Sequence, residues 1–145
     1  MNTQGTIRDP LNPKFVYQSP IDGRTRIEAH VERAIAAWYF ANGRKWEPAL
    51  DDSPDQFHVV REMRVEQLQP VVGPGNVRID VWVEHLGTTS CVYGFLISSE
   101  DGRVAHARGE RTIVKIDPLS QRPAPWSAFF RDKHAMLLKD LPAYA

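Results

Sequence analysis

The stretch HLGTTSCVYGFLISSEDGRVAHARGERTIVKID, residues 85–117, decides the fold. It holds two runs in which apolar and polar residues alternate, and a Glu-Asp-Gly turn at 100–102 separates them. Successive side chains of a strand point to opposite faces of a sheet, so this pattern predicts an antiparallel hairpin. No nucleophile triad or metal motif lies inside the stretch, so any chemistry must be sought on what the hairpin packs against.

Alternation continues on the N-terminal side of the hairpin. Residues 57–65 and 77–83 each alternate apolar with polar side chains, and residues 70–75 between them are rich in proline and glycine. Both runs therefore predict strands. A further short strand is predicted over 14–19.

The period changes after residue 26. Apolar side chains from Ile27 to Tyr39 recur every three or four residues, which predicts a helix over 27–42 that ends at Asn42-Gly43. Thr25 and Glu28 fit a capping box at its start. On the last strand of the sheet, the small residues at 105, 107 and 109 share one face, and we expect this helix to pack closely there.

The order of elements predicts one α+β domain spanning residues 1–145. Residues 1–13 carry several turn formers and little periodicity, so we expect an extended N-terminal arm. Residues 126–145 form a C-terminal extension, with a short helix expected over 126–138.

Composition excludes several classes of function. The chain has 18 basic and 18 acidic residues, so its balanced charge disfavours nucleic-acid binding. The single cysteine forms no internal disulfide, and no apolar run approaches membrane-spanning length, so we expect a cytoplasmic protein without membrane contact. The five histidines lack the paired spacing of a metal site, so no metal is predicted.

Several motifs occur together in this chain. They are PVVGPGNV at 70–77, LGTTS at 86–90, the turn at Asp101-Gly102, the strand with small residues, and Asp117 followed by Arg122-Pro123 and Pro125. In this combination and element order, residues 15–130 resemble hot-dog-fold acyl-CoA thioesterases of the 4-hydroxybenzoyl-CoA thioesterase-like group.

The resemblance implies a curved antiparallel sheet wrapped around one long central helix. It also implies a homodimer, or a dimer of dimers, whose sheets join edge to edge and whose active sites lie at the subunit interface. Strand 76–86 has a long apolar face without proline, so an unpaired edge there would favour association. An acyl-CoA is the implied substrate, and no cofactor is required beyond its coenzyme A.

In such enzymes a carboxylate near the start of the central helix is the nucleophile or the general base, and helix N-terminal amides polarise the thioester carbonyl. The usual Asp-x-x-Gly-His-Val-Asn-Asn motif appears here as Arg26-Ile-Glu-Ala-His-Val-Glu-Arg33, with Arg26 in place of the acid. The catalytic candidates are therefore Asp22, Glu28 and His30. The alternatives are a simple turn at Asp22-Gly23, a capping role for Glu28 and a solvated or capping His30.

The family also suggests a carboxylate from the partner subunit. Glu62 and Glu66 lie on a strand that could run beside the partner's helix, although a solvated sheet face explains them as well. His30 with such a glutamate would suit dehydration of a hydroxyacyl thioester. Cys91 falls within an apolar alternation and is expected to be a buried structural thiol.

Substrate-binding candidates complete the prediction. Trp38 and Tyr39 could line an acyl pocket or belong to the core. Thr89 and Ser90, with Thr88, could polarise a substrate group or form a turn. Cationic side chains suit the phosphates of coenzyme A, although they could equally face water. The cationic candidates are Arg103, Arg108 and Arg111.

Two classes of function follow from these residues. The first is a hydrolase that cleaves an acyl-CoA, or an acyl-carrier-protein thioester, by carboxylate-assisted attack of water or of Asp22 itself. The second is a hot-dog protein without hydrolytic activity that binds an acyl thioester. The arginine in place of the usual acid favours the second, and release of free thiol distinguishes the two.

Overall fold

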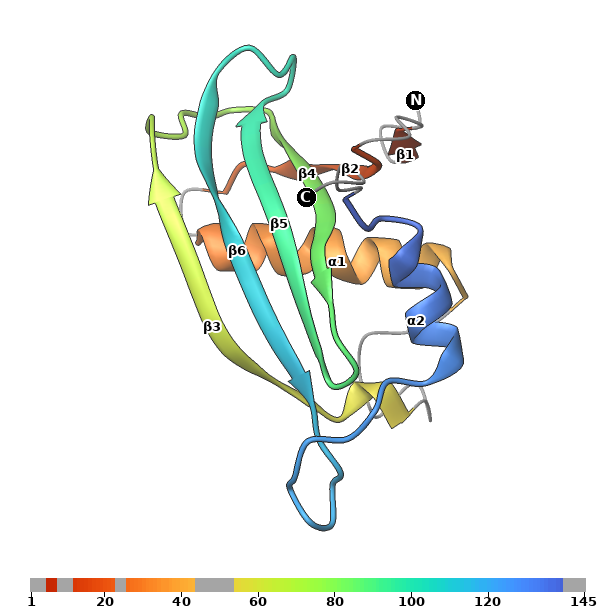
Figure 1. Cartoon of the computed structure of the whole chain (residues 1–145). Helices are drawn as coiled ribbons and strands as arrows, with labels where there is room; N and C mark the ends of the chain where they lie inside the picture. Colours follow the sequence, from red (N-terminus) through yellow and green to blue (C-terminus); the bar gives the residue numbers. More distant parts are fainter. Residues whose placement is uncertain (1–4, 8–11, 23–25, 44–53, 140–145) are drawn as a thin grey trace, which may run out of the picture.

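The structure is a computed structural model that describes residues 5–7, 12–22, 26–43 and 54–139. Its strands form one six-stranded sheet in the order β1-β2-β4-β5-β6-β3, and every neighbouring pair is antiparallel (Figure 1). The elements are β1 (Gly5–Ile7), β2 (Lys14–Pro20), α1 (Ile27–Ala41), η1 (Pro54–Gln56), β3 (His58–Gln67), β4 (Asn76–Leu86), β5 (Ser90–Ser99), β6 (Ala105–Lys115) and α2 (Ala128–Ala135).

The central helix lies across one face of the curved sheet (Figure 1). Its apolar stripe includes Val31 and Ile35, both buried against inward-facing side chains of β4 and β5 such as Ile79 and Phe95. Full burial of one such side chain contributes about 1.5–3 kcal/mol, so this stripe is the main attachment of α1 to the sheet. The predicted helix and α+β class are confirmed.

The structure differs from the sequence prediction at two places, the N-terminal arm and the start of α1. Gly5–Ile7 pair with β2, so this part of the expected N-terminal arm belongs to the sheet. The N-cap of α1 is Arg26, which makes no side-chain capping bond. The capping box needed Thr25 as N-cap and is wrong on that point; Thr25 and Gly23 lie outside the described residues.

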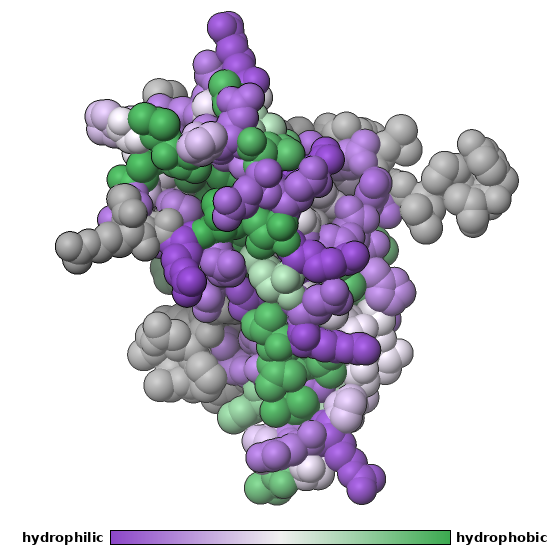
Figure 2. Space-filling view, turned by 90° about the vertical axis from the view of Figure 1, so that its left-hand side faces the viewer, coloured by the Kyte–Doolittle hydropathy of each residue, from purple (hydrophilic) through white to green (hydrophobic). Residues whose placement is uncertain are grey.

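The edge strands of the sheet are β1 and β3, not strand 76–86. β4 lies between β2 and β5, with both of its edges paired, so the expectation that its edge is available for association is wrong. β3 pairs only with β6 among the described strands. Along and beside β3 lie the exposed apolar side chains Phe57, Val59 and Val60, and Figure 2 shows apolar surface on this side of the molecule.

The small residues of β6 allow close packing against two different parts of the molecule, the core and β3. Ala107 is fully buried in the core, as expected for the helix-facing side. Gly109 is small for a different reason. A Cβ at this position would lie 1.9 Å from the backbone oxygen of Arg64 on β3. The glycine therefore permits close approach of the edge strand rather than of the helix.

The C-terminal part of the described chain closes one end of the core. Trp126, Phe130 and His134 stack in series, with ring centroids 3.7 and 3.6 Å apart. Within the described ranges, no helix is long and apolar enough to cross a bilayer. The same residues contain no cluster of three or more histidine, cysteine or acidic side chains that could hold a metal ion.

Candidate functional site

The first two amides of α1 have no hydrogen-bond partner among residues 26–43 and the other described ranges. The backbone N–H groups of Ala29 and His30 donate to the Arg26 carbonyl over 3.1 and 3.2 Å, so Ala29 is the first residue whose amide bonds within the helix. The amides of Ile27 and Glu28 come before it and are directed out of the helix start. Together with the positive end of the helix dipole they favour negative charge at this point.

A buried polar cluster joins this helix start to the end of β2. The hydroxyl of Ser19 lies 2.7 Å from Nδ1 of His30, and Nη1 of Arg33 donates to the same hydroxyl oxygen over 3.2 Å. Ser19 and His30 are both buried. The tautomer of His30 decides whether Ser19 or Nδ1 donates in this contact, since the hydroxyl oxygen can accept from Arg33 in either case.

Charge at the cluster links His30 with Asp22. Burial and the nearby Arg33 guanidinium lower the pKa of His30, and the carboxylate of Asp22 opposes this by raising it. The structure therefore brings Asp22 and His30 to the same helix start, with Asp22 exposed and His30 buried as a neutral imidazole. Glu28 is also exposed, but residues two apart on a helix do not face each other, so it points away from His30.

Two cavities flank this helix start. The first, of about 490 Å³, lies between α1, η1–β3 and β6. Its lining residues are Ala29, Glu32, Arg33, Ala36, Gln56, His58 and Arg111. It opens beside the first turns of α1, so a group held at the helix start could extend into it.

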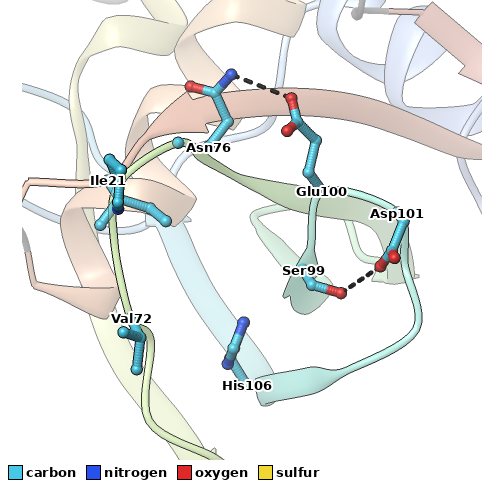
Figure 3. A pocket seen from close by; sticks show the side chains of 9 residues that line it. Ile21, Val72, Asn76, Ser99, Glu100, Asp101 and His106 are labelled. Atoms are coloured by element: carbon cyan, nitrogen blue, oxygen red, sulfur yellow. Dashed lines mark hydrogen bonds between the residues drawn. The ribbon is translucent and has the colours of Figure 1, made fainter.

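The second cavity, of about 420 Å³, adjoins Ile21, the residue before Asp22 (Figure 3). Its wall from the β5–β6 turn carries the carboxylates of Glu100 and Asp101, which hydrogen-bond Asn76 and Ser99 over 3.4 and 2.6 Å. These carboxylates make this cavity a poor receptor for phosphate.

The predicted aromatic and hydroxyl residues lie elsewhere. Trp38 and Tyr39 are 5% and 2% exposed, belong to the core and line neither cavity. Thr89 and Ser90 lie at the β4–β5 turn, where their carbonyls accept from Lys115 N–H over 2.8 Å and from Trp126 Nε1 over 3.1 Å. The structure therefore gives these four residues packing and turn contacts and does not bring them to the start of α1.

The three predicted cationic residues are not brought together. Arg103 is exposed in the β5–β6 turn beside Asp101, at 3.8 Å. Arg108 lies on the outer face of the sheet and pairs with Glu66 at 3.0 Å. Arg111 is buried on the helix-facing side, 3.9 Å from Glu32.

The carboxylates predicted on β3 form surface ion pairs. Glu62 lies 3.5 Å from Arg64, and Glu66 pairs with Arg108. Cys91 is buried, and burial raises the pKa of its thiol, although a hydrogen bond with Tyr93 lowers it slightly. Such a thiol remains protonated and has the structural environment that the sequence predicted.

Two buried polar groups escaped the sequence prediction. Asp55 follows a loop-like stretch, yet it is buried, accepts from the backbone N–H of Ser127 at 2.9 Å and lies 3.2 Å from Nζ of Lys115. Burial alone would raise the pKa of Asp55, but these hydrogen bonds and the Lys115 charge lower it overall. Asp55 thus remains ionised and ties η1 to β6 and to the start of α2.

The second buried group is His134. Its Nδ1 donates to the Phe130 carbonyl at 2.9 Å, so its Nε2 accepts from the Tyr93 hydroxyl at 2.6 Å. Burial lowers the pKa of His134 to about 3. His134 is therefore a neutral core residue, and no sequence pattern distinguishes it from a surface histidine.

Comparison with known proteins defines the class. The model of the thioesterase superfamily matches residues 26–106, which is more than half of the chain. The chain therefore belongs to the thioesterase superfamily. The match begins at Arg26, the N-cap of α1, so it covers His30 and the α1 residues that line the first cavity but not Asp22.

Solved structures show the same fold at low sequence identity. A Pseudomonas aeruginosa protein superposes with a TM-score of 0.70 at 20% identity, covering 88% of this chain and 93% of that one. The 1,4-dihydroxy-2-naphthoyl-CoA thioesterase of Synechocystis gives 0.70 at 11% identity, over 84% and 96%. A Staphylococcus aureus protein in complex with CoA gives 0.72 at 10% identity, over 92% and 89%.

These likenesses confirm the expected hot-dog fold. A search of curated proteins found no match.

Proposed function

We propose that this protein hydrolyses an acyl-CoA thioester at the start of α1. The observation that carries the proposal is the placement of Asp22 beside His30 and the free amides of Ile27 and Glu28, in a chain of the thioesterase superfamily. A carboxylate and converging amides at one point are the two components that acyl transfer to water requires.

The proposed reaction uses Asp22 in one of two ways. As general base, its carboxylate takes a proton from water while the water oxygen bonds to the thioester carbon; as nucleophile, it bonds to that carbon directly. In both cases the amides of Ile27 and Glu28 stabilise the oxyanion, the C–S bond breaks, and the CoA thiolate leaves and takes up a proton. When Asp22 is the nucleophile, water then cleaves the anhydride between the acyl group and Asp22, which releases the acid and restores the carboxylate. Ser19 and Arg33 hold the His30 ring in place.

Coenzyme A as the thiol carrier is the finer part of the proposal. The Staphylococcus aureus protein of the same fold was solved in complex with CoA. In this chain the exposed Arg103 and Arg108 are available to phosphate groups, although each now pairs with a carboxylate. We further propose that the reaction needs no cofactor beyond CoA and that the protein is cytoplasmic.

Assembly through β3 is a further part of the proposal. The strand offers ten residues of edge backbone, and its Val59 and Val60 are exposed. A long edge with apolar side chains is a template for pairing with a second strand. Antiparallel pairing of two β3 strands would form a homodimer with one continuous sheet, and would place partner residues near the cavity between α1 and β3.

A second function, binding of an acyl thioester without hydrolysis, is favoured by Arg26 at the position of the family's usual acid. Free-thiol release from short, long and aromatic acyl-CoAs, measured beside binding of the same compounds, distinguishes the two. We expect turnover of at least one compound. Binding of acyl-CoA with no thiol release from any of them would reject the hydrolase and support the binding protein.

A further inference from the structure

Arg111 is a buried cation whose hydrogen-bonding capacity is only partly used. It lies on β6 between Met63 of β3 and Tyr93 of β5, facing α1, and is 6% exposed. Its Nε has no hydrogen-bond partner among the described residues. Its Nη1 lies 3.9 Å from Oε2 of Glu32, beyond hydrogen-bond length, and the Glu32 side chain is itself 54% exposed.

A guanidinium in this position is costly to the apoprotein. Burial removes its hydration, and only close, well-directed acceptors restore that loss. The distant Glu32 carboxylate does not supply them. The arrangement is explained if the site is completed by an anion from outside the chain, because a guanidinium offers a planar pair of donors that matches a carboxylate.

The cavity around Arg111 suits such an anion. Arg111 and Arg33 line it together with Glu32, so its charged lining residues carry a net positive charge. Burial, and to a lesser extent the Arg111 charge, lower the pKa of His58 at the same wall, and its hydrogen-bond contact with the Asp55 carbonyl raises it only in part. His58 is therefore neutral near pH 7 and does not compete for the anion.

The cavity also lies at the right place relative to the proposed reaction. Ala29, Glu32 and Ala36 follow one side of α1 from its first turn. With a rise of 1.5 Å per residue, Glu32 lies about 9 Å along the axis from the N-cap. A short acyl group whose carbonyl is held at the helix start would thus place its far end beside Arg111. Ala29 and Ala36 leave room for the connecting carbons.

We propose that the preferred acyl group carries a carboxylate at its far end, and that Arg111 binds this carboxylate in the cavity between α1, β3 and β6. The proposal rests on the proposed thioester hydrolysis for its site and adds the class of substrate. It separates Arg111 from Arg103 and Arg108, which lie on other surfaces.

Matched substrates test the proposal. Succinyl-, glutaryl- and adipyl-CoA are compared with butyryl-, valeryl- and hexanoyl-CoA, which have the same number of carbons and no carboxylate. We expect the wild type to prefer a carboxylate-bearing member by at least about tenfold in kcat/KM, since loss of one buried charge-assisted pair costs that much or more. In Arg111→Met the preference should disappear, because kcat/KM falls more for the carboxylate-bearing member than for its uncharged counterpart. Arg122→Met, in the exposed turn after β6, is the matched control and should retain the preference.

The melting temperature separates binding from a structural role. Methionine fills a similar volume without a charge, so Arg111→Met should melt at or above the wild-type temperature in the absence of ligand. A lower melting temperature or loss of the oligomer would mean that Arg111 pairs within the protein or with a partner subunit, and would overturn the proposal. So would equal kcat/KM for matched substrates in the wild type.

Binding of a carboxylate by Arg111 can be tested independently of thioester hydrolysis. If no thioester is cleaved, calorimetric titration with glutarate and adipate still measures the anion site. Binding to the wild type that is lost in Arg111→Met would uphold the site while the hydrolase is rejected. No binding of either dicarboxylate to the wild type would overturn the inference as well.

Discussion

At the scale of single residues, Gly109 shows how one missing methyl group sets the distance between two strands. An added Cβ would lie 1.9 Å from the Arg64 carbonyl oxygen and 2.9 Å from the Phe95 ring. We expect Gly109→Ala to lower the free energy of unfolding by about 1–3 kcal/mol, because β3 must move away from β6. Urea denaturation measures the change. Thr112→Ala on the same strand is the control, and equal stability of the two variants would contradict the close approach.

Residue spacing contained more information than the sequence prediction used. Arg108 and Arg111 are three apart on one strand, and side chains of a strand alternate between faces. This spacing alone places the two on opposite faces, so they could not bind one ligand as neighbours. Ser19 and Arg33 could not be predicted in the same way, because their contact with His30 depends on how β2 meets α1.

At the scale of elements, Asp55 connects parts that are distant in sequence. It ties η1 to Lys115 at the end of β6 and to Ser127 at the start of α2. We expect Asp55→Ala to lower the free energy of unfolding by about 3–5 kcal/mol, because Lys115 is then left buried without its counter-charge.

A double variant isolates that charge. Adding Lys115→Met to Asp55→Ala should recover part of the lost stability, since no buried cation remains. Denaturant titration of both variants provides the measurement. An equal or greater loss in the double variant would show that the Asp55–Ser127 contacts, rather than the ion pair, dominate.

β3 is the element through which we expect two protomers to associate. Val59→Lys places a charge beside the exposed edge and should shift the protein toward monomer, because charge on an edge strand opposes pairing. Analytical ultracentrifugation over a range of concentrations measures this. Val104→Lys, an exposed apolar position in the β5–β6 turn, is the control and should leave the assembly unchanged. A wild type that remains monomeric at all concentrations would reject β3 pairing.

The presence and approximate bounds of the strands were predictable from the sequence, but their pairing within the sheet was not. Alternation located β3 to β6 within a few residues because each has one face in the core. A bulge between Val60 and Glu62 then changes the face that the following residues of β3 present, so Met63 faces inward while Val59 is exposed. Neither the bulge nor the pairing of β3 with β6 is set by local sequence, since both depend on contacts across the sheet.

At the scale of the whole molecule, stability depends on pH through the buried histidines. His134 has a pKa of about 3 in the folded state and 6.5 as its ordinary value. Between these values the unfolded chain binds a proton that the folded chain does not, so lowering the pH destabilises the fold. His134 contributes a loss of about 1.4 kcal/mol per pH unit over this window.

The variant His134→Gln measures that contribution. Its amide can still accept from Tyr93 but does not titrate, so the free energy of unfolding should fall less steeply between pH 6.5 and 4 than in the wild type. His30 and His58, whose pKa values are also lowered by burial, keep their share in both proteins. Identical slopes would show that His134 is not neutral in the folded state.

The proposed hydrolysis requires that Asp22 act on a thioester held at the start of α1. Its most direct test is the rate of thiol release from the best acyl-CoA by Asp22→Asn, compared with wild type and with Glu28→Gln, at equal acyl-CoA binding. We predict a loss in kcat of at least about a hundredfold for Asp22→Asn, as expected for removal of a general base, and less than tenfold for Glu28→Gln. Wild-type rates in Asp22→Asn would contradict the account, whatever the effect at Glu28.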